Sequence, residues 1–114
     1  VGEDPLPQYV LLDVKEGEVT CQFRKVSYDF EAMIRNQFAS GLVDFAKYWA
    51  LSDLYHAVTG IQYTKLLLLK VYPYANTHPD AFTDEQVWRK FALELGLRFT
   101  EEEILDFAKK QGLV

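Results

Sequence analysis

The chain of 114 residues is long enough for one domain, and its content of 49% apolar and 15% aromatic residues can build a core, which excludes a disordered chain. Its net charge of -5 leaves no electrostatic footprint for nucleic acid or for anionic membranes. Cys21 is the single cysteine, which excludes an internal disulfide framework and a cysteine-rich zinc site. We expect Cys21 to be a half-buried strand residue.

The sequence shows no membrane-spanning or secretory segment. The longest apolar run, Leu66–Leu69, is far shorter than the roughly 20 residues that span a bilayer. No signal peptide is visible, so we expect a cytoplasmic location. The first methionine is Met33, and we therefore expect that at least an initiator residue is missing from the start of the chain.

The first elements in chain order are a loop and a β-hairpin. Residues 1–8 contain glycine and two prolines and predict an extended loop. Residues 9–14 and 18–26 alternate loosely with period two and predict strands, and the glycine of residues 15–17 suits a turn. Because an isolated hairpin is marginal in water, this one must pack on helices, on a partner chain or on a sheet lost upstream.

Helical periodicity begins at Asp29, which can cap a helix that starts at Phe30. Ser40-Gly41 predicts a kink or a break. The helix that follows is amphipathic and ends at Gly60. Its apolar stripe consists of Leu42, Phe45, Ala46, Trp49, Ala50, Leu54 and Ala57.

The last part of the chain predicts three more helices. Residues 61–72 fit a third helix or a buried strand, and their length and two lysines favour a helix that Pro73 stops. A loop over residues 73–82 precedes two short helices, which open with capping boxes and end at glycines. The first of these helices has its capping box at Thr83–Gln86 and its glycine at Gly96, and the second has its capping box at Thr100–Glu103 and its glycine at Gly112. The inner stripes are Val87, Trp88, Phe91 and Leu95, then Ile104, Leu105, Phe107 and Ala108.

The sequence therefore predicts an α+β fold, with an N-terminal β-hairpin followed by a bundle of four or five helices. We divide the chain into a loop and hairpin in residues 1–28 and a helical region in residues 29–114.

Candidate metal ligands are sparse. Asp53 and His56 lie three residues apart on the second predicted helix, so they share a face and could both contact one ion. An ordinary surface pair explains this spacing better. His78 follows Thr77 in a loop, where histidines are usually solvated. The acidic run Glu101–Glu103 is explained by the attraction of carboxylates to a helix N-terminus.

Nucleophile and phosphate-binding motifs are absent from the sequence. Ser27, Ser40 and Ser52 lack a G-x-S-x-G context, and there is no glycine-rich phosphate loop. Arg24 and Lys25 could meet a phosphate, but adjacent strand residues point to opposite faces, so at most one could face a site. We therefore predict no catalytic, cofactor-binding or metal-binding residue in this chain.

Aromatic residues crowd the middle of the chain: Tyr48, Trp49, Tyr55, Tyr63, Tyr72 and Tyr74. They suit the edge of a helical core first and an interface second. With the open edges of a two-stranded sheet, they favour a partner, either a homo-oligomer or an upstream catalytic domain.

The hairpin resembles the end of small bacterial calcineurin-like metallophosphoesterases. The resemblance rests on a Y-x-L-L-D strand at Tyr9–Asp13, a G-E-V turn at Gly17–Val19 and an F-R-x-V-x-Y-D strand at Phe23–Asp29. It covers about residues 1–35, and residues 36–114 would be a helical extension beyond that fold.

The resemblance implies an α/β/β/α enzyme in which two metal ions, often manganese, iron or zinc, activate a water that attacks phosphorus. The ligand motifs of the family, such as D-x-H, G-N-H-[DE] and G-H-x-H, lie upstream of this segment and none occurs here. No catalytic residue is therefore carried over. Under this hypothesis the chain is the C-terminal, non-catalytic portion of a phosphoesterase, and its helices form a cap or an oligomerisation region.

A second hypothesis is a stand-alone helical interaction domain without enzymatic activity. A third is a DNA-binding module built from the last two helices, but residues 83–112 are acidic in balance and phosphate contacts require the opposite.

Overall fold

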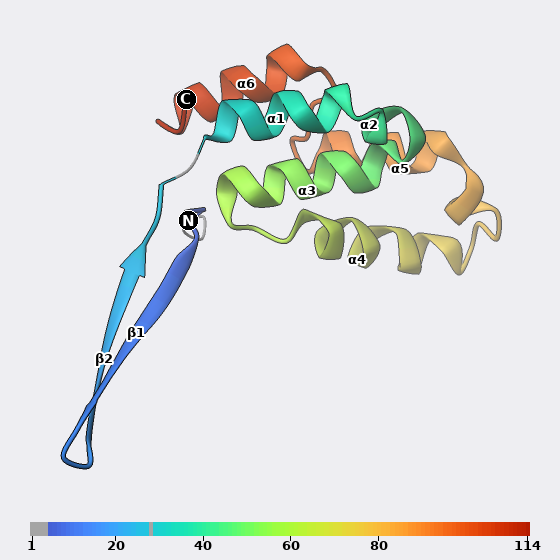
Figure 1. Ribbon diagram of the computed structural model, residues 1–114. Helices are drawn as coiled ribbons and strands as arrows, with labels where there is room; N and C mark the ends of the chain where they lie inside the picture. The colour runs from blue at the N-terminus through green and yellow to red at the C-terminus, as the bar shows by residue number, and fades with distance from the viewer. Residues whose placement is uncertain (1–4, 28) are drawn as a thin grey trace.

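The computed structural model describes residues 5–27 and 29–114, and it has the expected α+β fold, a two-stranded antiparallel hairpin followed by helices (Figure 1). The elements are β1 (Gln8–Lys15), β2 (Glu18–Lys25), α1 (Phe30–Ala39), α2 (Leu42–Phe45), α3 (Lys47–Thr59), α4 (Tyr63–Ala75), the 3-10 turn η1 (Ala81–Thr83), α5 (Glu85–Glu94) and α6 (Glu101–Lys110). The hairpin projects from the helical region, and the molecule measures 61 × 32 × 26 Å. The predictions for residues 1–4 and the boundary at residue 28 lie outside the described residues.

The β1–β2 hairpin closes through a two-residue turn. Gln8 pairs with Lys25 at one end and Lys15 with Glu18 at the other, without a break in register. Glu16 and Gly17 have φ values of 52° and 81°, the positive pair that a type I′ turn requires. The twist of this turn matches that of antiparallel strands, so the local sequence determines the hairpin.

Helix α3 is the centre of the helical region. It contacts α1, α2, α4 and α5, while α6 packs along α1 on the outer side (Figure 1). The core cluster takes more of its buried side chains from α3 than from any other helix, and adds others from α1, α4, α5 and α6. Among them are Ala50, Leu51, Leu54, Tyr55 and Val58 of α3, with Ile34, Leu67 and Ile104 from the other helices. Removal of this apolar area from water is the main stabilising contribution to the helical region.

The amphipathic helix predicted over residues 42–57 is interrupted at Ala46, whose φ of -137° and ψ of 64° are not helical. The break changes the helical phase, so the predicted apolar stripe is wrong in its first half. Phe45 is 90% exposed and Trp49 is 60% exposed. In the second half of the stripe, Ala50 and Leu54 are buried as expected, and Ala57 is partly buried.

Two predicted helix boundaries are also wrong. Helix α4 continues through Pro73 to Ala75, because a proline ring fixes φ at a helical value and in the last turn removes only one backbone hydrogen bond. The N-cap of α5 is Asp84, whose carboxylate accepts a hydrogen bond from the Gln86 amide at 3.0 Å. Thr83, the expected cap, lies in η1 instead.

The other helix signals are confirmed. Asp29 caps α1 by accepting from the Ala32 amide at 2.9 Å, and Thr100 caps α6 by accepting from the Glu103 amide at 3.2 Å. Gly60 ends α3 with a φ of 79°. The inner stripes of the last two helices are buried at Val87, Phe91, Ile104 and Ala108. Within the described residues, no helix combines the length and apolarity needed to cross a bilayer.

Candidate functional site

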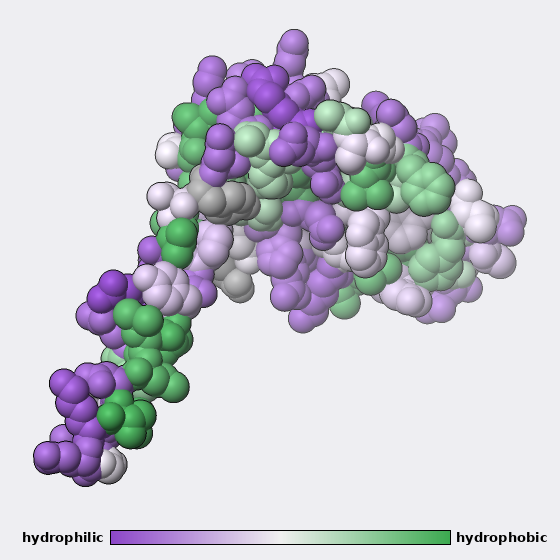
Figure 2. Space-filling view, in the orientation of Figure 1, coloured by the Kyte–Doolittle hydropathy of each residue, from purple (hydrophilic) through white to green (hydrophobic). Residues whose placement is uncertain are grey.

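One face of the hairpin is apolar over most of its length and has no cover among the described residues. The strand register places Gln8 and Lys25 at one end of this face, followed by three apolar cross-strand pairs: Val10 with Phe23, Leu12 with Cys21, and Val14 with Val19. Leu12 is 66% exposed and Phe23 is 74% exposed. Figure 2 shows the hydrophobic residues along one side of the arm. We call the six residues of the three apolar pairs the hairpin face.

The opposite side of the hairpin is mixed in character. It carries Thr20 and Arg24, whose side chains donate to the Asp13 carbonyl at 3.4 Å and to Gln22 Oε1 at 2.8 Å. Cys21 is exposed, and the expectation of a half-buried residue is therefore wrong. The physical reason is that the described chain places nothing over the hairpin face.

The aromatic cluster divides between core and surface. Tyr55 is buried, and its hydroxyl oxygen accepts a hydrogen bond from the Arg98 amide at 3.0 Å. Burial raises the pKa of Tyr55 above its ordinary value. Tyr63 packs edge-on against Tyr55 with ring centroids 5.7 Å apart. Trp49 and Tyr72, by contrast, are mostly exposed.

Tyr48 links α3 to the start of α5. Its hydroxyl donates to Glu85 Oε1, and its ring meets Phe99 edge-on at 5.9 Å. Burial, followed by the hydrogen bond to Glu85, raises the pKa of Tyr48 to about 12. The phenol is therefore held in its neutral form and joins two helices that are distant in sequence.

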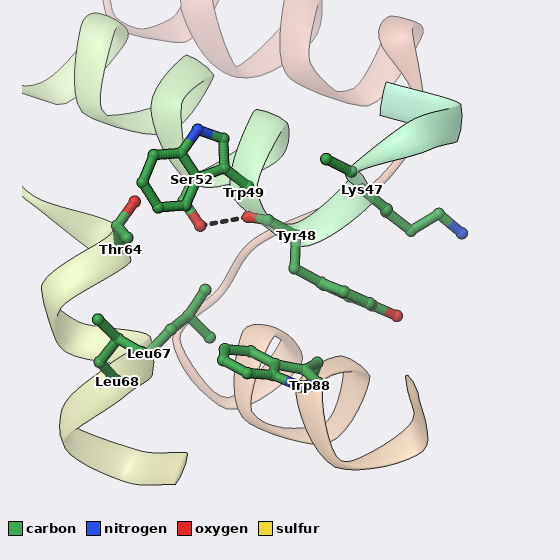
Figure 3. A pocket seen from close by; sticks show the side chains of 9 residues that line it. Lys47, Tyr48, Trp49, Ser52, Thr64, Leu67, Leu68 and Trp88 are labelled. Carbon is green, nitrogen blue, oxygen red and sulfur yellow. Dashed lines mark hydrogen bonds between the residues drawn. The ribbon is translucent and has the colours of Figure 1, made fainter. Parts of the chain in front are cut away.

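An aromatic cleft opens between α3, α4 and α5. It has a volume of about 280 Å³, and its walls include Tyr48 and Trp49 of α3, Leu67 and Leu68 of α4, and Trp88 of α5. Figure 3 shows the Trp49 and Trp88 rings on different sides of this space, with the Lys47 ammonium pointing away from them.

Two polar groups of the cleft walls make hydrogen bonds within the protein. The Ser52 hydroxyl donates to the Tyr48 carbonyl, and the Trp88 indole N–H donates to the Phe82 carbonyl at 3.0 Å. The rings consequently present apolar faces to the cleft, and its walls suit an apolar group.

A second cleft of about 600 Å³ adjoins the first one and shares Trp49, Thr64 and Leu68 with it. Asp53 and His56 both line this second cleft, so the prediction that they share a face is confirmed. No set of three potential metal ligands gathers anywhere in residues 5–27 and 29–114, and the two remain a surface pair.

The remaining candidate residues have local roles. His78 stacks on Tyr74 with ring centroids 3.9 Å apart, and its Nδ1 lies 2.9 Å from Thr77 Oγ1. Glu101 pairs with Arg35 across α6 and α1 at 3.3 Å. These contacts hold a loop and a helix pair in place, and they form no acid–base constellation.

Comparison with protein-family models, with curated proteins and with solved structures gave no match. The hairpin face and the two aromatic clefts are therefore the features from which function is argued.

Proposed function

We propose that this chain is the non-catalytic C-terminal portion of a metal-dependent phosphoesterase, in which the β1–β2 hairpin completes the enzyme's sheet and the helical region forms a cap or an oligomerisation region. The observation that carries this proposal is the hairpin face. A two-stranded ribbon with three consecutive apolar pairs on one face and mixed residues on the other has the pattern of a strand pair packed on one side.

The size of the hairpin face favours a covalently linked sheet as its cover. At about 3.4 Å per residue and 4.8 Å between strands, eight paired residues make a footprint of roughly 27 by 10 Å. The area buried on both partners would be about 540 Å², well under the 1,200 Å² of a stable interface between separate proteins. A sheet in the same polypeptide needs less area, because linkage raises its effective concentration to about the millimolar range.

Under this proposal the metal pair belongs to the segment that precedes the hairpin. When bound, such a pair lowers the pKa of a water and clamps the oxygens around phosphorus. The described residues form no group of three potential metal ligands. The part of this chain is to cover the sheet and to present the helices.

The reading frame upstream of codon 1 in the source gene tests the proposal. We expect D-x-H, G-N-H-[DE] and G-H-x-H motifs in that order. The longer protein should hydrolyse bis(p-nitrophenyl) phosphate with a divalent metal, and the 114-residue chain should not. A start codon directly before Val1, or metal-dependent turnover by this chain alone, would contradict the proposal.

A variant of the longer protein tests the hairpin itself. Leu12→Thr with Phe23→Thr should lower the melting temperature of the longer protein much more than that of this chain. The matched control is Thr20→Ala, on the opposite side of the same hairpin. Equal shifts in both proteins would show that the hairpin face is not covered.

The second candidate function is a stand-alone interaction domain. The observation in its favour is the pair of apolar clefts that meet at Trp49, since monomeric proteins rarely expose large contiguous apolar patches without use. A start codon directly before Val1 would favour this candidate.

A further inference from the structure

Several exposed aromatic residues of the helical region belong to one continuous surface. Trp49 and Leu68 line both clefts, and Leu69 and Tyr72 line the second. The Tyr72 and Phe82 ring centroids are 5.0 Å apart, and those of Phe82 and Trp88 are 6.4 Å apart. Because Trp88 lines the first cleft, these ring contacts connect the second cleft to the first. We call this surface, made of Trp49, Leu68, Leu69, Tyr72, Phe82 and Trp88, the aromatic face.

The area of the aromatic face, counted on two copies, approaches the lower bound for a biological interface. Trp49, Leu69 and Tyr72 are 60%, 61% and 59% exposed, and Phe82 is 42% exposed. At about 200 Å² for each side chain, these four leave roughly 450 Å² of apolar surface. Two such surfaces would bury about 900 Å², and a polar rim would bring the total past the 1,000 Å² expected of a biological interface.

The cleft walls carry charges of both signs, so they are complementary to a second copy of the same surface. Among the acidic residues that the structure describes, only Asp53 lines either cleft, and it is accompanied by Lys47 and Lys65. Neither lysine has an ion-pair partner in the part of the chain that the structure describes. A purely acidic partner would face Asp53 and a purely basic one would face the lysines. A second copy of the chain brings both signs.

We infer that the aromatic face is a two-fold interface between two copies of this chain, with Asp53 of each protomer opposite Lys65 of the partner subunit. In a two-fold interface every contact occurs twice, once in each direction, so one Asp53–Lys65 pair implies a second. The net charge of -5 opposes association in general, but the two cleft linings contain a single described carboxylate, that of Asp53. The inference rests on the proposed role of the helical region in oligomerisation.

Sedimentation equilibrium over a concentration series tests the inference. The chain is measured with Leu12→Thr and Phe23→Thr in place, so that association through the hairpin face is removed. We expect this background protein to form dimers. Trp49→Ala and Tyr72→Ala should each raise the dimer dissociation constant about tenfold, the loss that removal of a central aromatic anchor causes. Both residues are exposed, and circular dichroism checks that the fold is retained.

A charge swap tests the pairing. Asp53→Lys and Lys65→Asp should each weaken the dimer several-fold, and an equal mixture of the two variants should restore it, because the opposite charges then meet again. Lys109→Asp, on the exposed surface of α6, is the matched control and should leave the dimer unchanged.

Three outcomes would overturn the inference: a background protein that is monomeric at the highest concentration, a dimer indifferent to Trp49→Ala and Tyr72→Ala, or a mixture that fails to restore association. None of them bears on the phosphoesterase proposal, which depends on the upstream motifs and on turnover.

Discussion

The hydrogen bond between Tyr55 and the Arg98 amide gives the sharpest test of the packing. Tyr55→Phe removes a single oxygen atom and leaves the ring, so no cavity forms in the core. The buried ring stays in contact with Tyr63 and Phe107, whose centroids lie 5.7 and 5.2 Å away. The only partner lost is the acceptor for the amide, at 3.0 Å.

The expected cost follows from the group that is left unpaired. A buried donor that loses its acceptor costs about 1–3 kcal/mol, and since the Arg98 amide is only partly buried we expect about 1–2 kcal/mol. For a chain of 114 residues, an unfolding entropy near 2.1 cal/mol/K per residue converts 1 kcal/mol into a shift of roughly 4 °C. The melting temperature should therefore fall by about 4–8 °C.

Chemical denaturation monitored by circular dichroism measures the free energy of unfolding directly, and a thermal scan gives the temperature shift. The matched control is Tyr63→Phe. Tyr63 packs on Tyr55, but its hydroxyl makes no hydrogen bond within the described residues, so this change should cost less than about 0.5 kcal/mol. A Tyr55→Phe variant as stable as the control would refute the reasoning that this bond joins α3 to the segment before α6.

Three further perturbations test the fold in other places. The pKa of Tyr48 is raised to about 12 from an ordinary 10.0, so its contribution to stability is complete below pH 10 and is lost as the pH rises towards 12. The Tyr48→Phe variant should therefore lose less stability than the original chain between pH 10 and pH 12. An unchanged alkaline profile would contradict the hydrogen bond to Glu85. Thr100→Ala should cost about 1 kcal/mol through loss of the N-cap of α6, measured by urea denaturation, and a neutral result would show that the cap is dispensable. Leu12→Thr and Phe23→Thr should each change the stability of this chain by less than about 0.5 kcal/mol, because both side chains are already in water, and a large loss would mean that the hairpin face is covered within the chain.

The sequence predicted the elements whose signals are local. The hairpin follows from alternating residues around Glu16-Gly17, where the turn geometry is a property of two residues. The starts of α1 and α6 follow from Asp29 and Thr100, because a capping side chain bonds to an amide only three residues away.

The errors occur where local signals compete. Ala46 is a good helix former, and its sequence neighbours give no signal of a break. One continuous helix was therefore predicted across Ala46, where the structure has a non-helical residue. A proline is a strong stop signal in a helix interior but a weaker one near a helix end. Pro73 lies in the last turn of α4, which continues to Ala75.

The amino-acid sequence by itself determined the order and type of the elements, because hydrogen bonds and side-chain periodicity act over a few residues. Only the tertiary structure decided which aromatic residues are core and which are surface. Tyr55 and Trp49 are about one and two-thirds helical turns apart and are both aromatic residues of α3, yet the first is buried and the second is exposed. The neighbouring helices decide this difference, since α3 is surrounded by α1, α4 and α5 over only part of its circumference.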